Sequence, residues 1–110
     1  MRFTFKIEKL PTSGGPIVPV RTVTLDYDII KIGSLPSSHL LLDDAQVSRM
    51  HAVIETDPCP PDGDGSPGAS IIDLGSAAGT IVNGKKINQH RLRSGDILTL
   101  GRTRIIVSFQ

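Results

Sequence analysis

The feature that most constrains the fold is the Asn83-Gly84 dipeptide, which lies between two short β-type segments, residues 80–82 and 85–87. Both residue types tolerate positive φ, which a two-residue type I′ turn requires, so these segments are expected to form a hairpin. Comparable segments with alternating or β-branched apolar residues recur along the chain, separated by glycine, proline and aspartate. They cover residues 2–8, 20–25, 29–33, 40–42, 51–55, 70–73, 97–100 and 104–109. No segment has a helical apolar period, so an all-β sandwich or barrel is predicted.

Residues 56–69 interrupt this pattern. They contain four prolines and the run Asp62-Gly63-Asp64-Gly65, so an exposed, mobile loop without regular structure is predicted. The alternation elsewhere predicts which side chains form the core. These are Phe3, Phe5, Ile7, Val23, Ile32, Leu42, Val53, Ile72, Val82, Leu98, Ile105 and Val107.

Composition excludes several classes of function. Twelve basic against eleven acidic residues and 4% aromatic residues argue against a nucleic-acid binder, which needs a basic surface and stacking platforms. No apolar run is long enough to insert into a membrane, and charges interrupt the N-terminal apolar residues, so no signal peptide is expected. A lone cysteine, Cys59, fits a reducing compartment. A cytoplasmic domain without cofactors is therefore expected.

Two stretches carry the polar residues that could form a site. Residues 47–54 place Ser48, Arg49 and His51 where a strand begins, and residues 73–84 form a loop punctuated by glycine. The Ser48–His51 pair could suggest a nucleophile and its base, but no orienting acid or oxyanion-hole motif accompanies it, so an enzyme is not expected. The three histidines and Cys59 lack the paired spacing of a zinc site, so no metal is expected.

Several residues in these stretches are expected to shape the loops. Glycine is needed where a turn requires positive φ or close approach, and an aspartate can accept backbone N–H bonds within a turn. The residues predicted to act in this way are Gly75, Gly79, Gly84, Gly95, Asp73 and Asp96.

The order and spacing of the motifs closely resemble the forkhead-associated (FHA) domain. The matching motifs are Ile32-Gly33, residues 40–44, residues 47–52, residues 73–76, Gly79-Thr80, residues 82–84, Gly95-Asp96 and Leu100-Gly101. The resemblance extends from about residue 28 to about residue 107, and the length of 110 residues predicts that residues 1–110 form a single domain. It implies an antiparallel β-sandwich of two packed sheets with about eleven short strands. It also implies that the loops at one end bind phosphothreonine peptides.

Residues that match the family's site take their expected roles from the resemblance. The Ser48 hydroxyl would donate to a phosphate oxygen, and Arg49 would bear on the phosphate or on the residues that follow it. His51 would brace the loops without touching the ligand, and Gly33 and Thr80 keep the shape of the pocket.

Other positions depart from the family pattern. Ser34 stands where the family has an arginine that reaches the phosphate, and Ala78 stands where it has an asparagine that holds the peptide backbone. Ala77 lacks the hydroxyl or amide that some members use. Asn83 is expected to act chiefly as a turn residue, with peptide contact as the alternative.

The leading hypothesis is a protein-interaction module of a longer signalling or scaffolding chain in which phosphothreonine recognition is weakened or lost. The alternatives are ordinary phosphothreonine binding through Ser48 and Arg49 with a substitute cation, Lys31 or Arg102, and homotypic assembly through the sheet faces.

Overall fold

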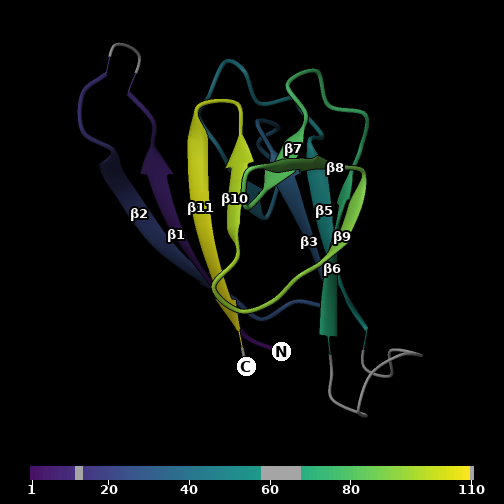
Figure 1. Ribbon diagram of the computed structural model, residues 1–110. Coiled ribbons are helices and arrows are strands. Elements are labelled where there is room, and N and C mark those ends of the chain that lie inside the picture. Colours follow the sequence, from purple (N-terminus) through teal and green to yellow (C-terminus); the bar gives the residue numbers. More distant parts are fainter. Residues whose placement is uncertain (12–13, 58–67, 110) are drawn as a thin grey trace.

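The computed structural model describes residues 1–11, 14–57 and 68–109, and these form two β-sheets packed against each other (Figure 1). One sheet has six strands, in the order β2 (Val18–Leu25), β1 (Phe3–Lys9), β11 (Thr103–Phe109), β10 (Ile97–Leu100), β7 (Thr80–Val82) and β8 (Lys85–Ile87). The other has five, in the order β4 (Leu40–Leu41), β3 (Ile29–Gly33), β5 (Ala52–Asp57), β6 (Gly68–Asp73) and β9 (Gln89–Arg91). The predicted all-β sandwich is confirmed. No helix in the described residues could cross a membrane.

The core lies between the sheets and follows from the alternation along the strands. Strands β1 and β11 pair in register from Phe3↔Phe109 to Lys9↔Thr103, so Phe5 and Val107 lie opposite each other and face inward. Nine of the predicted core residues are buried: Phe3, Phe5, Ile7, Ile32, Leu42, Val82, Leu98, Ile105 and Val107. Val23 is partly buried and packs against this cluster.

The core prediction was wrong for Val53 and Ile72. These two residues are partners in the β5–β6 register and only partly buried, whereas their neighbours Ile54 and Ile71 are fully buried and also pair. Successive side chains of a strand point to opposite faces. Because both strands contain consecutive apolar residues, alternation alone could not identify the inward face, and Val53 and Ile72 lie on the outer face.

The predicted 56–69 loop was wrong at both ends. Thr56 pairs with Ala69, and Asp57 pairs with Gly68, so β5 and β6 extend into it, and Ala69 is buried. Residues 58–67, including Cys59, lie outside the described residues. Strand β9 was also missed, because Gln-His-Arg carries no apolar alternation and forms a strand only by pairing with β6.

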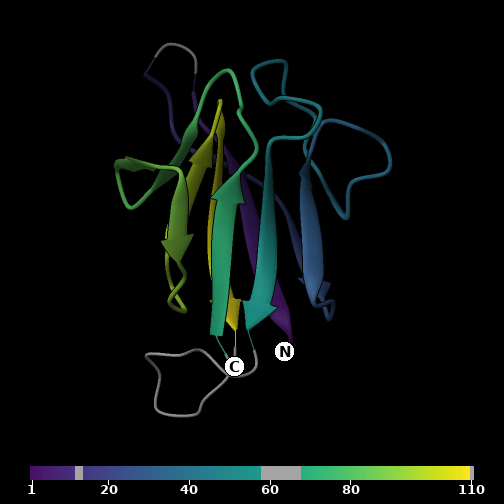
Figure 2. The ribbon, with the colours of Figure 1, turned by 90° about the vertical axis from the view of Figure 1, so that its right-hand side faces the viewer.

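The loops that carry the candidate residues gather at one end of the sandwich. In Figures 1 and 2 the β4–β5 and β6–β7 loops lie at the upper end, whereas the N- and C-termini lie at the lower end. The β3–β4 loop joins them through backbone hydrogen bonds, from Ser34 N to Ser48 O at 3.1 Å and from Leu35 N to Arg49 O at 3.2 Å.

Candidate functional site

Gly33 sets how closely the first two loops approach. A Cβ atom at this position would lie 2.1 Å from the carbonyl oxygen of Arg49, far inside van der Waals contact. Only glycine allows this approach without moving backbone, so the end of β3 can hold the Ser48–Arg49 segment against it.

His51 ties the loops together from inside. Its side chain is fully buried, and its Nδ1 accepts a hydrogen bond from the Ser48 backbone N–H at 3.1 Å. Because Nδ1 is the acceptor, Nε2 carries the proton and donates to the Gly79 carbonyl at 2.8 Å. One neutral imidazole therefore holds the β4–β5 loop to the β6–β7 loop.

Ser48 adds a second connection between the same loops. Its Oγ accepts a hydrogen bond from the Ala77 backbone N–H at 3.1 Å, so the hydroxyl proton remains as a donor. The imidazole contacts the Ser48 backbone and not its hydroxyl, so the two side chains do not form the hydrogen bond of a nucleophile and its base.

Arg49 follows Ser48 and is exposed. Within the described ranges, its guanidinium takes part in no hydrogen bond or ion pair. A guanidinium offers paired N–H donors that match the oxygens of a phosphate or carboxylate. Ser48 and Arg49 together therefore present a hydroxyl and a cation at the same loop, which is the chemistry that an anionic group requires.

Asp73 fixes the β6–β7 loop. One carboxylate oxygen accepts the backbone N–H groups of Gly75 at 3.0 Å and Ser76 at 3.2 Å. The other accepts the hydroxyls of Ser76 and of buried Thr80, the latter at 2.7 Å. Burial by itself raises the pKa of Asp73, but these hydrogen bonds, led by those of the Ser76 and Thr80 hydroxyls, lower the pKa below the usual 3.8. Gly75 and Gly79 adopt positive φ in this loop, at 74° and 85°.

The structure also places the three positions that were expected to depart from the family pattern, Ser34, Ala77 and Ala78. The Ser34 hydroxyl donates to the Val47 carbonyl at 3.1 Å, so its proton is engaged within the loops. Ala77 and Ala78 are exposed and carry no polar side-chain atoms.

Lys86 was not among the candidates, and its side chain lies against Gly79. A Cβ built on Gly79 would lie 2.9 Å from Lys86 Cε and 3.5 Å from its Nζ. Lys86 belongs to β8, where it pairs with Ile81. No local pattern connects it with the loop, because the contact depends on how the hairpin folds back. The ammonium group is thus a third polar group beside the β6–β7 loop. Lys31 instead lies on β3 opposite Val53, and the Arg102 guanidinium donates to the Leu10 carbonyl at 3.4 Å.

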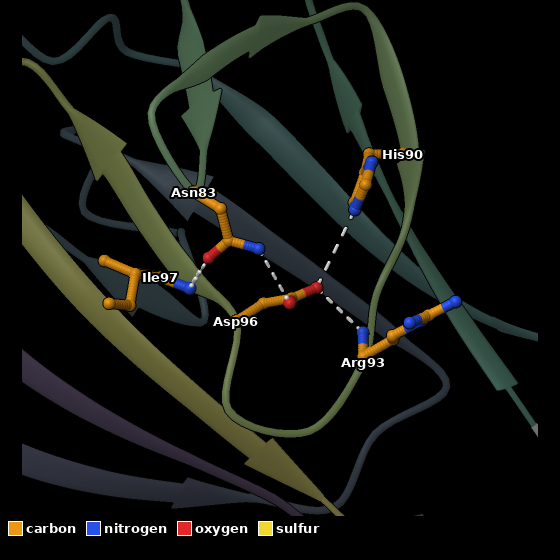
Figure 3. Close-up of polar contacts among 5 residues, drawn as sticks. All are labelled: Asn83, His90, Arg93, Asp96 and Ile97. Carbon is orange, nitrogen blue, oxygen red and sulfur yellow. Dashed lines mark hydrogen bonds and ion pairs between the residues drawn. The ribbon is translucent and has the colours of Figure 1, made fainter.

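Asn83 does not join this cluster. Figure 3 shows its amide between Ile97 and Asp96: the oxygen accepts the Ile97 N–H at 2.9 Å, and the nitrogen donates to the Asp96 carboxylate at 3.0 Å. The other Asp96 oxygen accepts the Arg93 N–H at 2.8 Å and lies 3.7 Å from His90 Nε2. Asn83 and Gly84 have φ of 52° and 84°, and Gly95 has 98°, as their turns require.

Asp44 is a second residue whose role the sequence analysis missed. Its carboxylate accepts the N–H groups of Gln46 and Arg102 and the hydroxyl of Thr103, each at 2.8–2.9 Å. Burial raises its pKa, but these hydrogen bonds and the positive charge of Lys9 lower it below 3.8 overall. Asp44 therefore anchors the β4–β5 loop to the β10–β11 turn.

Comparison with known proteins identifies the family that this architecture resembles. The FHA domain family model matches residues 30–101. An oxoglutarate dehydrogenase inhibitor from Corynebacterium diphtheriae is 37% identical over 82 residues, which cover 74% of this chain and 52% of that protein. The chain thus spans about half the length of this curated relative.

Two solved structures share the fold over almost their whole length. One, from a structural and functional analysis of phosphothreonine-dependent FHA domain interactions, has a TM-score of 0.73 at 29% identity and covers 100% of this chain and 98% of that one. The other is the FhaA FHA domain complexed with the intracellular domain of Rv3910, with a TM-score of 0.70 at 30% identity, covering 96% and 98%.

Proposed function

This chain belongs to the FHA domain family, and from that premise we propose that its loops bind a phosphothreonine segment of a partner protein more weakly than a complete family site would. The observation that carries the proposal is that the Ser48 hydroxyl and the Arg49 guanidinium still have unused hydrogen-bond donors. Both belong to a loop whose shape is held by His51 and Gly33, and both retain donors that no other described residue uses.

The missing contacts set the size of the weakening. A hydrogen bond to a charged group contributes about 1.5–3 kcal/mol, so losing one charged and one neutral contact removes on the order of 2–4 kcal/mol. At about 1.4 kcal/mol for each tenfold, binding weakens roughly 30- to 1,000-fold. Recognition of this strength would act together with further contacts.

The relatives favour a regulatory binding module over an enzyme. The similar protein from C. diphtheriae is named an inhibitor, and the FhaA FHA domain forms a complex with the intracellular domain of Rv3910. By analogy, this domain would act within a longer cytoplasmic chain, where its role is to recruit a phosphorylated protein.

Restoring the two missing side chains tests the proposal. The double variant Ser34→Arg/Ala78→Asn is expected to bind a phosphothreonine peptide about 30- to 1,000-fold more tightly than the parent in calorimetry. The gain should fall with added salt, disappear when Ser48→Ala is added, and be absent for the unphosphorylated peptide. Ser108→Arg provides the control, because it adds the same charge at an exposed position of β11. No gain in a folded double variant, or equal binding of both peptides by the parent, would contradict phosphothreonine recognition by these loops.

Lys86 supports a second candidate, in which phosphothreonine binds at ordinary affinity because this ammonium replaces the family's arginine. The observation behind it is the packing of Lys86 against Gly79. This candidate predicts low-micromolar binding by the parent that Lys86→Gln abolishes. Lys85→Gln is the matched control, because adjacent residues of a strand point to opposite faces. If the parent binds weakly and both variants behave alike, Lys86 is not the substitute.

A further inference from the structure

Strand β2 forms one edge of the six-stranded sheet, and the proposed function makes no use of it. β2 stands at the end of the strand order, and within the described residues it pairs only with β1. Figure 1 shows it at the outer left of its sheet. The backbone N–H and C=O groups on the outer side of an edge strand can pair with another chain. This edge can therefore accept an added strand.

Exposed apolar side chains gather at the same edge. Of the eight large apolar side chains that are exposed in the described part of the chain, three lie on β2 or directly before it, and a fourth lies on β4. These are Ile17, Val18, Val20 and Leu41, with exposed fractions of 38–55%. Apolar side chains clustered in this way are typical of an interaction surface.

A groove of about 300 Å³ lies between β2 and β4, at the side where the two sheets end. The buried side chains of Ile7 and Leu42 line it, together with the exposed side chains of Val20 and Leu41. The groove thus connects the exposed apolar cluster with the core, and an aliphatic side chain placed in it would contact apolar atoms from both sheets.

A β-bulge turns two successive side chains of β2 toward the groove. Ile7 pairs with Arg21 and the next residue of β1 pairs with Pro19, so Val20 has no partner on β1. Successive residues of a regular strand face opposite sides, yet Val20 and Arg21 both line the groove. Pro19 has no N–H to offer, so the regular part of β2, residues 21–25, is the part that suits an added strand.

The charges at the groove indicate what it accepts. The Arg21 guanidinium donates to the Leu41 carbonyl, and the Lys9 ammonium donates to the Asp43 carbonyl at 2.6 Å. Neither cation forms an ion pair within the described residues, and both retain unused N–H donors. Asp43 is the one acidic side chain among the described residues that line the groove, so the lining carries a net positive charge. An aliphatic side chain accompanied by an acidic one is therefore complementary.

An extended segment of a partner protein fits this edge better than a second copy of the chain. β2 contains no acidic residue, so a second β2 would bring no carboxylate to Lys9 and Arg21. The eight residues of β2 span about 26 Å and packed sheets lie about 10 Å apart, so the whole edge measures roughly 260 Å² in outline. A stable dimer buries about 800 Å² on each partner. A single added strand needs only backbone hydrogen bonds along the edge and a pocket for one side chain.

We propose that an extended segment of a partner protein adds as a strand to residues 21–25 of β2. It places an aliphatic side chain in the groove and an acidic side chain, two residues away, beside Lys9 and Arg21. Residues two apart on a strand face the same side, so both side chains reach the groove together. None of the groove residues belongs to the proposed phosphothreonine site, so this interface needs no phosphate.

The probe is a threonine-rich peptide of the same length as β2, with a valine and a glutamate two residues apart, titrated into ¹⁵N-labelled protein. The backbone amide signals of residues 21–25 and 41–43 are expected to shift. Alternate amides of residues 21–25 should also become protected against hydrogen exchange, because the added strand accepts their N–H groups. A peptide with proline at its centre should not bind, because proline removes a backbone donor.

Paired variants test the charge and the groove. Arg21→Glu should weaken binding of the glutamate peptide about fivefold and favour a peptide with lysine in its place. Arg93→Glu, which makes the same charge change at an exposed position of the β9–β10 loop, should leave binding unchanged. Val20→Gln should remove the preference for valine over serine, whereas Ile29→Gln, at a 51% exposed position of β3, should retain it. The same spectra report whether each variant is folded.

Several results would overturn the proposal. It is wrong if no peptide shifts the β2 signals, if the proline peptide binds equally well, or if Arg21→Glu and Arg93→Glu behave alike. Shifts without protection of the β2 amides would mean that the groove binds a side chain without strand addition. Shifts that follow the protein concentration in the absence of peptide would mean that a second copy occupies the edge. The phosphothreonine proposal would stand in each case, because it depends on other residues.

Discussion

Replacing His51 tests whether one buried side chain holds the site loops together. His51→Ala removes both hydrogen bonds of the imidazole, to the Ser48 N–H and to the Gly79 carbonyl, from a fully buried position. Each buried polar group left without a partner costs about 1–3 kcal/mol. Water entering the cavity would relieve part of that cost, so a net loss of about 3 kcal/mol is expected. This is a large part of the 5–15 kcal/mol by which domains are typically stable.

Urea unfolding measures this loss. The transition midpoint should fall while the slope stays constant, because the surface exposed on unfolding is unchanged. In thermal unfolding, about 3 kcal/mol corresponds to a fall in Tm of roughly 12–24 °C. His51→Phe removes the same hydrogen bonds and leaves no cavity, because phenylalanine is somewhat larger than histidine, so it separates the contribution of the hydrogen bonds from that of the cavity. His39→Ala is the control, because His39 is exposed and accepts one hydrogen bond, from the Lys31 N–H.

The hydrogen bonds would be unimportant if His51→Phe were as stable as the parent. A stable variant with weaker phosphopeptide binding would instead mean that the imidazole acts on the ligand and not on the loops. Stability and phosphopeptide binding are expected to fall together, because the same two contacts set the fold of the loops and the position of Ser48.

Four further substitutions test other parts of the structure. Gly33→Ala should lower the free energy of unfolding by more than about 2 kcal/mol in urea unfolding, because its Cβ would overlap the Arg49 carbonyl, and unchanged stability would contradict this. Asp73→Asn should lower the free energy of unfolding above pH 4. The difference in stability between variant and parent should shrink as the pH falls below 3.8 and through the lowered pKa of Asp73, because the ionised carboxylate is the form that the hydrogen bonds stabilise. A difference that does not change with pH would refute this. Ile54→Ala should cost about 2–5 kcal/mol and Val53→Ala much less, and equal losses would mean that the assigned face of β5 is wrong.

The sequence located most strands because their signals are local. Asn83-Gly84 marks its hairpin through backbone preferences of two residues, and both adopt positive φ in the structure. Sheet order depends on pairing between distant segments, which local chemistry does not encode. Strand β4 pairs in parallel with β3, and β9 pairs with β6 although its own sequence lacks a strand pattern.

The contacts of the candidate site are likewise of two kinds, local ones and ones between distant segments. The bracing role of His51 was expected from the family resemblance, and its hydrogen bond with the Ser48 backbone N–H joins residues only three apart in the chain. The contact of Ser48 with Ala77, and that of Lys86 with Gly79, join segments that meet only in the folded protein. No spacing rule predicts those contacts. The sequence analysis therefore identified Ser48, Arg49 and His51 as candidates but missed Lys86, whose ammonium group lies beside the β6–β7 loop.

The structure also shows which residues shape the loops of the proposed site. The loops are held by groups that are buried or belong to the backbone, chiefly His51, Asp73 and Gly33, whereas the positions that differ from the family make few internal contacts. Ala78 is exposed, and Ser34 contributes one hydrogen bond, to the Val47 carbonyl. Ser34→Arg/Ala78→Asn should therefore cost about 1 kcal/mol of stability or less, the usual worth of one such bond. Urea unfolding of the double variant measures this. A larger loss would mean that Ser34 and Ala78 also stabilise the loops. The residues that shape the loops and the residues at the ligand-contact positions would then not be separate sets.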